Sequence, residues 1–179
     1  MTATALRSDD PYETGLSLSA KGQHLQAIEQ FERALATRPD DPRVLFALGN
    51  TARALGLSQA AEEFFGRVLK LEPQRLEALV NLANLLRARG QASSAVALLE
   101  PALAHGEQAA ELWLTLGSAW REMGDTTEAE ECFREALSRR GDYAPALGNL
   151  ADILADRGEV EEGLSLYERA VKRDPQNPQ

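Results

Sequence analysis

One pattern returns five times along the chain at a fixed spacing of 34 residues, and no insertion interrupts it. Its clearest column is an unbroken series of glycines: Gly22, Gly56, Gly90, Gly124 and Gly158. A second column holds large side chains: Phe31, Phe65, Leu99, Phe133 and Tyr167. A third holds small ones: Gly15, Gly49, Ala83, Gly117 and Ala151. Such self-similarity is the signature of a repeat protein, in which each unit buries its apolar face against its neighbours.

Each unit is expected to contain two helices separated by the glycine column. In residues 42–75, Leu45, Leu48 and Ala52 lie on one stripe of a first helix, and Phe65 and Val68 lie on one stripe of a second. Glycine between them suits the left-handed conformation that often ends a helix. We expect first helices near residues 11–20, 43–55, 76–89, 110–123 and 144–157. We expect second helices near residues 23–36, 58–70, 91–104, 125–138 and 159–172.

The period and the alternation of small and large columns resemble the tetratricopeptide repeat (TPR) family, whose unit is a helix–turn–helix of 34 residues. The resemblance extends from Ser8 to Asn177 and includes Pro39, Pro73 and Pro175. It implies an all-α, right-handed solenoid, or superhelix, of five repeats: 8–41, 42–75, 76–109, 110–143 and 144–177. Residues 1–7 lack the pattern and are expected to be disordered. Pro101 lies inside a second helix, which should therefore bend or stop early.

Charge and composition exclude several classes of function. The net charge of −9 argues against attachment to nucleic acid or to an anionic membrane surface, both of which need a basic surface. No apolar run approaches the roughly 20 residues that span a bilayer, and residues 1–10 lack the apolar core of a signal peptide. The single cysteine excludes an internal disulfide and suits a reducing compartment. We therefore expect a cytoplasmic protein.

The sequence offers no catalytic, cofactor or metal site. His24 and His105 are far apart in sequence, and neither has a carboxylate or cysteine at ligand spacing. The glycines stand singly after helices, so they do not form a phosphate-binding loop. Cys132 has no neighbouring histidine in the sequence and is expected to be an inert, structural thiol. We expect a protein that is not an enzyme and that needs no cofactor.

In the TPR family the first helices line the concave side of the solenoid, where ligands usually lie, so the resemblance implies a binding groove on these helices. Residues three or four positions apart, opposite the packed stripe, should share this face. The predicted groove residues are Arg43, Phe46, Asn50, Arg53, Val80, Asn81, Asn84, Arg87, Leu114, Ser118, Arg121 and Asn149.

Three of these residues, Arg53, Arg87 and Arg121, form a ladder with one arginine in each repeat. A guanidinium group suits carboxylates, and repeated guanidinium groups could hold an extended chain. The predicted ligand is therefore an extended acidic, or acidic and apolar, peptide lying across repeats two to four. An alternative is that Glu77, Glu111 and Glu122 pair with the ladder and leave a solvated lattice of ion pairs.

The apolar stripe on the same face has two interpretations. Tyr12, Phe46, Val80 and Leu114 could contact a ligand, or they could pack helix against helix. Two binding modes known in the family fit only in part. Asn50 and Asn84 resemble the asparagines of a carboxylate clamp, but Phe46 and Tyr12 stand where a lysine would be wanted. Asn81 and Asn149 resemble rungs of an asparagine ladder, which Ala47 and Thr115 interrupt.

Three functions remain open at this point. The first is a non-catalytic scaffold with a protein or peptide partner. The second is the substrate-recognition arm of a longer enzyme, of the protein glycosyltransferase or sulfotransferase type; the ending Asp174–Pro178 reads like a linker, so the natural chain is expected to continue past Gln179. The third is a self-assembling scaffold, a homo-oligomer joined through Leu164 and Val171 on an uncovered last helix.

Overall fold

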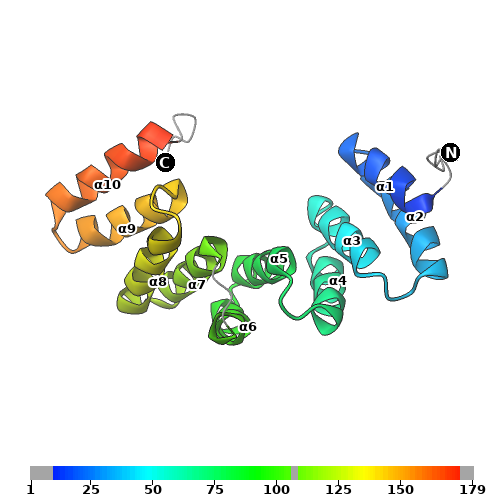
Figure 1. Ribbon diagram of the computed structural model, residues 1–179, viewed down its shortest axis with the longest axis horizontal. Helices are drawn as coiled ribbons and strands as arrows, with labels where there is room; N and C mark the ends of the chain where they lie inside the picture. The colour runs from blue at the N-terminus through cyan, green and yellow to red at the C-terminus, as the bar shows by residue number, and fades with distance from the viewer. Residues whose placement is uncertain (1–9, 106–108, 174–179) are drawn as a thin grey trace, which may run out of the picture. The chain divides into compact units, whose positions relative to one another are not determined.

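The computed structural model describes residues 10–105 and 109–173, and these ranges are helical apart from the turns. The helices are α1 (Pro11–Ala20), α2 (His24–Thr37), α3 (Pro42–Ala54), α4 (Ser58–Leu71), α5 (Leu76–Ala88), α6 (Ala92–Ala104), α7 (Ala110–Met123), α8 (Thr126–Arg139), α9 (Ala144–Asp156) and α10 (Val160–Arg173) (Figure 1). They form consecutive helix–turn–helix pairs with no strand in the described ranges. The predicted all-α solenoid is confirmed, and every helix begins and ends within one residue of its expected position. The segment 1–7, predicted to be disordered, lies outside the described residues.

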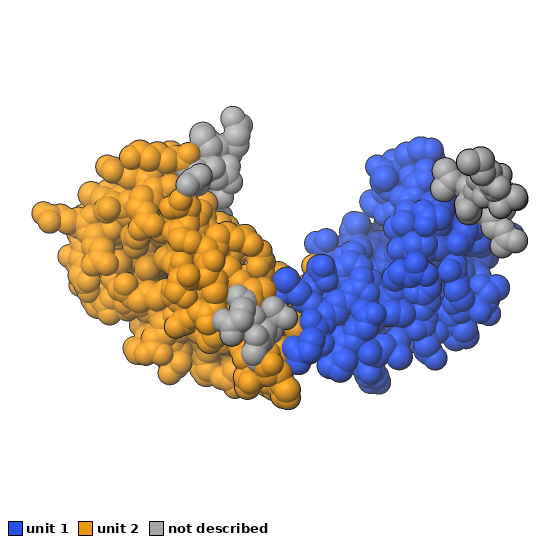
Figure 2. Space-filling view, in the orientation of Figure 1, with its two compact units in different colours: residues 1–78 blue, residues 79–179 orange. Residues whose placement is uncertain are grey.

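The chain divides into two compact units, residues 1–78 and residues 79–179 (Figure 2). In the first unit α1 packs against α2, α3 packs against α4, and α2 also contacts α3. In the second unit α7 packs against α8, α9 packs against α10, and α6 and α8 contact the first helix of the following repeat. α2 and α8 therefore each pack one side against their own repeat and another side against the next.

The large column of the sequence pattern forms the centre of both cores. Phe31, Phe65 and Phe133 are completely buried. In the first unit Phe31 packs with Val44 and Leu48 of the next repeat, and in the second unit Phe133 packs in the same way with side chains of α9. Burying one such ring stabilises the fold by about 2–3 kcal/mol. Phe31 therefore joins the first repeat to the second, and Phe133 joins the fourth repeat to the fifth.

The turns between paired helices depend on the glycine column. All five glycines of that column have a positive φ, as in Gly56 at 73° and Gly124 at 87°, and no residue of any other type has one in the described ranges. A Cβ at Gly56 would meet nothing within 4 Å, so the requirement comes from the backbone conformation and not from lack of space. The expected left-handed helix ends are confirmed.

Pro101 does not end α6. Of the two expected outcomes, a bend or an early stop, the early stop does not occur, because α6 continues through Pro101 to Ala104. A proline removes only its own backbone N–H, and the carbonyl of Pro101 still accepts a hydrogen bond from the backbone N–H of His105 at 3.1 Å. One missing bond in the last turns of a helix whose apolar face is buried does not unwind it.

Candidate functional site

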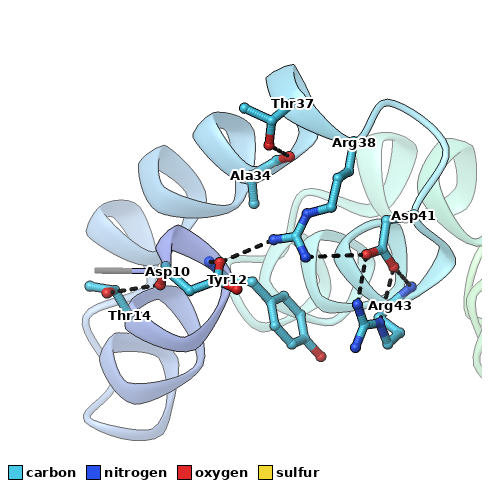
Figure 3. Close-up of polar contacts among 8 residues, drawn as sticks. All are labelled: Asp10, Tyr12, Thr14, Ala34, Thr37, Arg38, Asp41 and Arg43. Atoms are coloured by element: carbon cyan, nitrogen blue, oxygen red, sulfur yellow. Dashed lines mark hydrogen bonds and ion pairs between the residues drawn. The ribbon is translucent and has the colours of Figure 1, made fainter. Parts of the chain in front are cut away.

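In the first unit, the predicted groove residue Arg43 is already bound at the start of α3. Its guanidinium donates two hydrogen bonds to the carboxylate of Asp41, at 3.2 Å from Nε and 3.0 Å from Nη2 (Figure 3). Asp41 also accepts the backbone N–H of Arg43 and so caps the helix. The side-chain hydrogen bond from Arg43 holds the pKa of the Asp41 carboxyl below its ordinary value. Arg43 is therefore paired with the carboxylate that caps its own helix.

A single arginine joins this cap to the cap of the preceding first helix. Arg38 lies in the loop between α2 and α3, with Nη2 3.0 Å from the carboxylate of Asp10 and Nη1 3.7 Å from that of Asp41 (Figure 3). Asp10 caps α1 by accepting the backbone N–H of Tyr12 at 3.0 Å. The two cap carboxylates thus share one cation, which fixes the starts of α1 and α3 relative to each other. Sequence analysis did not identify this connection between Asp10 and Arg38, because the two residues are 28 positions apart.

The aromatic side chains on the first-helix face of this unit belong to the packing between helices. The ring of Phe46 lies 5.6 Å from that of Phe65, and the guanidinium of Arg75 lies 4.3 Å from the centre of the Phe46 ring. One repeat earlier, the ring of Tyr12 lies 6.1 Å from that of Phe31. The rings of Tyr12 and Phe46 are both half-buried. Of the two interpretations of the apolar stripe, packing of helix against helix therefore describes these residues better than contact with a ligand.

The remaining predicted residues of the first unit differ in exposure. Asn50 is half-buried and Arg53 is exposed. Among the residues that the structure describes, none forms a salt bridge with Arg53. Arg53 therefore presents a guanidinium that a ligand could reach without breaking an existing ion pair.

In the second unit, Arg87 of α5 is held by two residues of the predicted face. Its Nη2 and Nε lie 2.6 and 3.2 Å from Oε1 of Glu122 on α7, and its Nη1 donates to Oδ1 of Asn84 at 2.9 Å. The Arg87 side chain is 21% exposed. An incoming carboxylate would therefore compete with Glu122 for a guanidinium that is already oriented.

Arg121, one repeat later on α7, repeats this relationship. Its Nη1 donates to Oδ2 of Asp152 on α9 at 3.0 Å. Asp152 also accepts a hydrogen bond from the hydroxyl of Tyr167 on α10. This hydrogen bond, together with burial and the negative charge of Asp152, raises the pKa of Tyr167 to about 12. Each of these two arginines thus binds a carboxylate from the first helix of the following repeat.

The other predicted residues of the second unit are less accessible. Val80, Asn81 and Asn149 are half-buried, and Leu114 packs against the apolar clusters around Phe133 and Ala136. Ser118 is only 7% exposed, and its hydroxyl donates to the carbonyl of Leu114 at 2.9 Å. The surfaces of Ser118 and Leu114 are therefore used inside the protein and offer little to a ligand.

The acidic partners of the arginine ladder differ from those suggested by sequence. Of the three glutamates considered, Glu122 pairs with a ladder residue, whereas Glu77 lies 3.8 Å from Arg75 and Glu111 pairs with Arg140. The carboxylate that pairs with Arg121 belongs to Asp152, which is not one of these glutamates. The first-helix face of the second unit is therefore an alternating row of guanidinium and carboxylate groups.

Neither histidine lies in a site with metal-ligand chemistry. Nδ1 of His105 lies 2.6 Å from the carbonyl oxygen of Pro101, and His24 stands at the start of α2. Within the described residues there is no group of three or more histidine, cysteine or acidic side chains that could hold a metal ion.

None of the helices in the same part of the chain has both the length and the apolar character needed to cross a bilayer.

Comparison with known families and structures agrees with this architecture. A family model described as tetratricopeptide repeat matches residues 12–75 and 121–178, and a second model with the same description matches residues 52–119. A comparison with curated proteins found no match.

Several solved structures share the fold. MamA from Desulfovibrio magneticus RS-1 is 18% identical, with a TM-score of 0.80 over 99% of this chain and 100% of that one. A TPR protein of Thermus thermophilus is 27% identical, with a TM-score of 0.72 over 93% of this chain and 91% of that one. YrrB, described as a TPR protein with an unusual peptide-binding site, is 18% identical, with a TM-score of 0.71 over 93% of this chain and 86% of that one.

Proposed function

Because this chain belongs to the tetratricopeptide repeat family, we propose that it is a non-catalytic scaffold that binds a protein partner through the exposed faces of its first helices. The family and the similar solved proteins support a role in protein–protein interaction. The peptide-binding site for which YrrB is described gives one example of a ligand on this fold. The nature of the partner has to be argued from the side chains of this chain.

The ligand that these side chains suit is an extended segment carrying carboxylates. The observation that carries this proposal is that Arg87 and Arg121 each already bind a carboxylate supplied by the next first helix. The carboxylates of Glu122 and Asp152 are 41% and 46% exposed, and ion pairs near the surface contribute only about 0–1 kcal/mol, so a ligand carboxylate can exchange with them at little cost.

Binding of a defined acidic peptide tests this proposal. The probe is Ac-Glu-Leu-Glu-Leu-Glu-NH2, compared by calorimetry with the same peptide in which glutamine replaces every glutamate. The double substitution Arg87→Ala/Arg121→Ala should weaken binding of the acidic peptide by about tenfold or more and reduce its salt dependence. The matched control is Arg33→Ala/Lys70→Ala, which removes the same charge from exposed positions on α2 and α4. Equal affinities of the two double variants would refute the groove.

Self-assembly is a second candidate, favoured by the exposed apolar side chains of α10. Leu164 and Val171, seven residues apart on this helix, are 57% and 54% exposed, and Val160 is 54% exposed. Such a stripe suits packing against another helix. If this stripe packs against a second copy of the chain, sedimentation velocity will show a concentration-dependent dimer. The double substitution Leu164→Ser/Val171→Ser should abolish that dimer. Leu25→Ser on α2, at a residue 70% exposed, is the control.

A further inference from the structure

A pocket in the second unit, separate from the first-helix face, combines two tryptophans with four carboxylates. It measures about 460 Å³ and is lined by α6, α7 and α8, of which α7 contacts both of the others (Figure 1). One helix, α7, supplies Trp113, Leu116 and Trp120. The carboxylates come from the other two helices: Glu100, Glu128, Glu131 and Glu135. A pocket of this volume is large enough for a long side chain or a small molecule.

The charge of the pocket is only partly neutralised. Glu135 pairs with Arg139. Glu100, Glu128 and Glu131 form no ion pair with any residue in the described ranges. Glu128 opens α8, where the helix dipole favours a negative charge, but Glu100 lies near the C-terminal end of α6, where the dipole opposes one. The position of Glu100 is therefore not explained by helix stability.

The pKa of the buried Cys132 thiol, which lines the pocket, is raised in part by this negative charge. Burial and, after it, the charges of Glu128, Glu131 and Glu100 raise the pKa of Cys132 to about 12. Burial disfavours a charge of either sign, but the part of the shift that comes from the three glutamates disfavours only a negative charge, and the same carboxylates would attract a positive one.

The aromatic side chains add a surface on which a flat cation can rest. The guanidinium of Arg139 already lies 5.1 Å from the centre of the Trp113 ring. Nε1 of Trp113 is buried and has no hydrogen-bond partner in the described part of the chain. A tryptophan face attracts cations, and guanidinium most readily of the protein cations because it stacks as well.

We propose that this pocket binds an arginine side chain presented by a protein partner. Its guanidinium would stack on the tryptophans and donate to the carboxylates of Glu100 and Glu131, while its aliphatic stem would cover Leu116. Charge complementarity selects this occupant, because three unpaired carboxylates exclude an acidic segment and the aromatic rings favour a planar cation over a compact ammonium group. This site does not depend on the first-helix face and would take a segment of opposite charge.

The chain contains two tryptophans, and both line the pocket, so its intrinsic fluorescence reports on this site. The probe is Ac-Gly-Arg-Gly-NH2, compared with Ac-Gly-Cit-Gly-NH2, in which citrulline keeps the shape of arginine without its charge. The arginine peptide should change the fluorescence saturably, with a Kd of about 1–10 mM for so small a ligand. The citrulline peptide should bind about tenfold more weakly or not at all.

The matched variants remove two charges either from the pocket or from elsewhere. Glu100→Gln/Glu131→Gln should weaken binding of the arginine peptide by about tenfold, because both substitutions remove carboxylates that face the guanidinium. Glu29→Gln/Glu32→Gln, at exposed positions on α2, should leave the affinity unchanged. Circular dichroism and thermal unfolding of each variant show whether its fold is intact.

Three outcomes would overturn this proposal. The first is equal binding of the arginine and citrulline peptides, and the second is equal weakening by the two double variants. The third is a dimer of the peptide-free chain that Glu100→Gln/Glu131→Gln dissociates, because the occupant of the pocket would then be a second copy of this chain.

Discussion

Gly49 of α3 and Phe65 of α4 fit together so closely that a Cβ added at Gly49 would stand 2.7 Å from Cε1 of the phenylalanine ring. Real Cβ atoms do not approach a carbon atom so closely, and Phe65 is completely buried, so the ring cannot move aside freely. Gly117 and Phe133 repeat this relationship in the second unit, also at 2.7 Å. The small and large columns of the sequence are therefore two sides of one contact.

The first prediction concerns this contact. Gly49→Ala should lower the free energy of unfolding by about 1–3 kcal/mol, because overpacking exceeds the gain in helix propensity. The control is Gly66→Ala within α4, where an added Cβ meets nothing within 4 Å; it should raise stability by about 0.5–1 kcal/mol. Phe65→Leu in the Gly49→Ala background should recover part of the loss, since the third repeat pairs Ala83 with Leu99 at these columns. Urea unfolding measures all of them, and a stabilising Gly49→Ala would contradict the contact.

The second prediction concerns the arginine that joins two helix caps. Arg38→Ala should lower the free energy of unfolding by about 1 kcal/mol at low salt, since it leaves Asp10 and Asp41 without their shared cation. The effect should shrink in concentrated salt because the contacts are partly exposed. Arg33→Ala, an exposed arginine of α2, should change stability little at either salt concentration. An equal effect of both substitutions would show that the shared cation adds nothing.

The third prediction separates a binding face from a lattice of ion pairs. Glu122→Gln removes the carboxylate that occupies Arg87, so binding of the acidic peptide should tighten, by about threefold. Glu63→Gln, an exposed residue of α4, makes the same charge change elsewhere and should have a smaller effect. Calorimetry at fixed salt gives both affinities. If Glu122→Gln binds no better than Glu63→Gln, Arg87 does not contact the ligand.

The fourth prediction concerns the single thiol. With its pKa raised from 9.0 to about 12, folded Cys132 stays protonated at pH 8. Its reaction with a disulfide reagent such as DTNB should therefore be about a thousandfold slower than in the unfolded chain, which follows from the thiolate fraction alone. The unfolded chain in concentrated urea provides the reference rate. Rapid labelling of the native protein would mean that the thiol is neither buried nor surrounded by negative charge.

The fifth prediction concerns the hydroxyl that donates to Asp152. Absorbance at 295 nm should show Tyr167 ionising near pH 12, and Tyr167→Phe assigns this step. Asp152→Asn should move the ionisation toward pH 10, because it removes the negative charge that opposes a phenolate. The sign for stability follows: above pH 10 the unfolded chain loses this proton first, so stability falls as the pH rises from 10 toward 12. Asp40→Asn, at an exposed residue of the other unit, should leave the ionisation of Tyr167 unchanged.

The sequence alone was sufficient for the fold because its signals are local. The φ of 73° at Gly56 depends on a few neighbouring backbone atoms, so a glycine at the right place is enough to predict it. Phe31 and Phe65 occupy the same position in consecutive repeats, and both are buried. Their recurrence was sufficient to predict a repeated core, because a fixed repeat length places corresponding side chains in similar surroundings.

Tertiary structure decided which polar groups meet. Sequence analysis placed Arg87 and Arg121 on one face, but only the distance between neighbouring first helices selected Glu122 and Asp152 as their partners. It also decided that Ser118 is buried and that Trp113 and Trp120 line a pocket with carboxylates from two other helices. Arginine and glutamate side chains are long and flexible, and a shift of a few ångströms between helices changes which pairs form. Periodicity within a chain fixes the backbone, whereas these pairings depend on the packing of one repeat against the next.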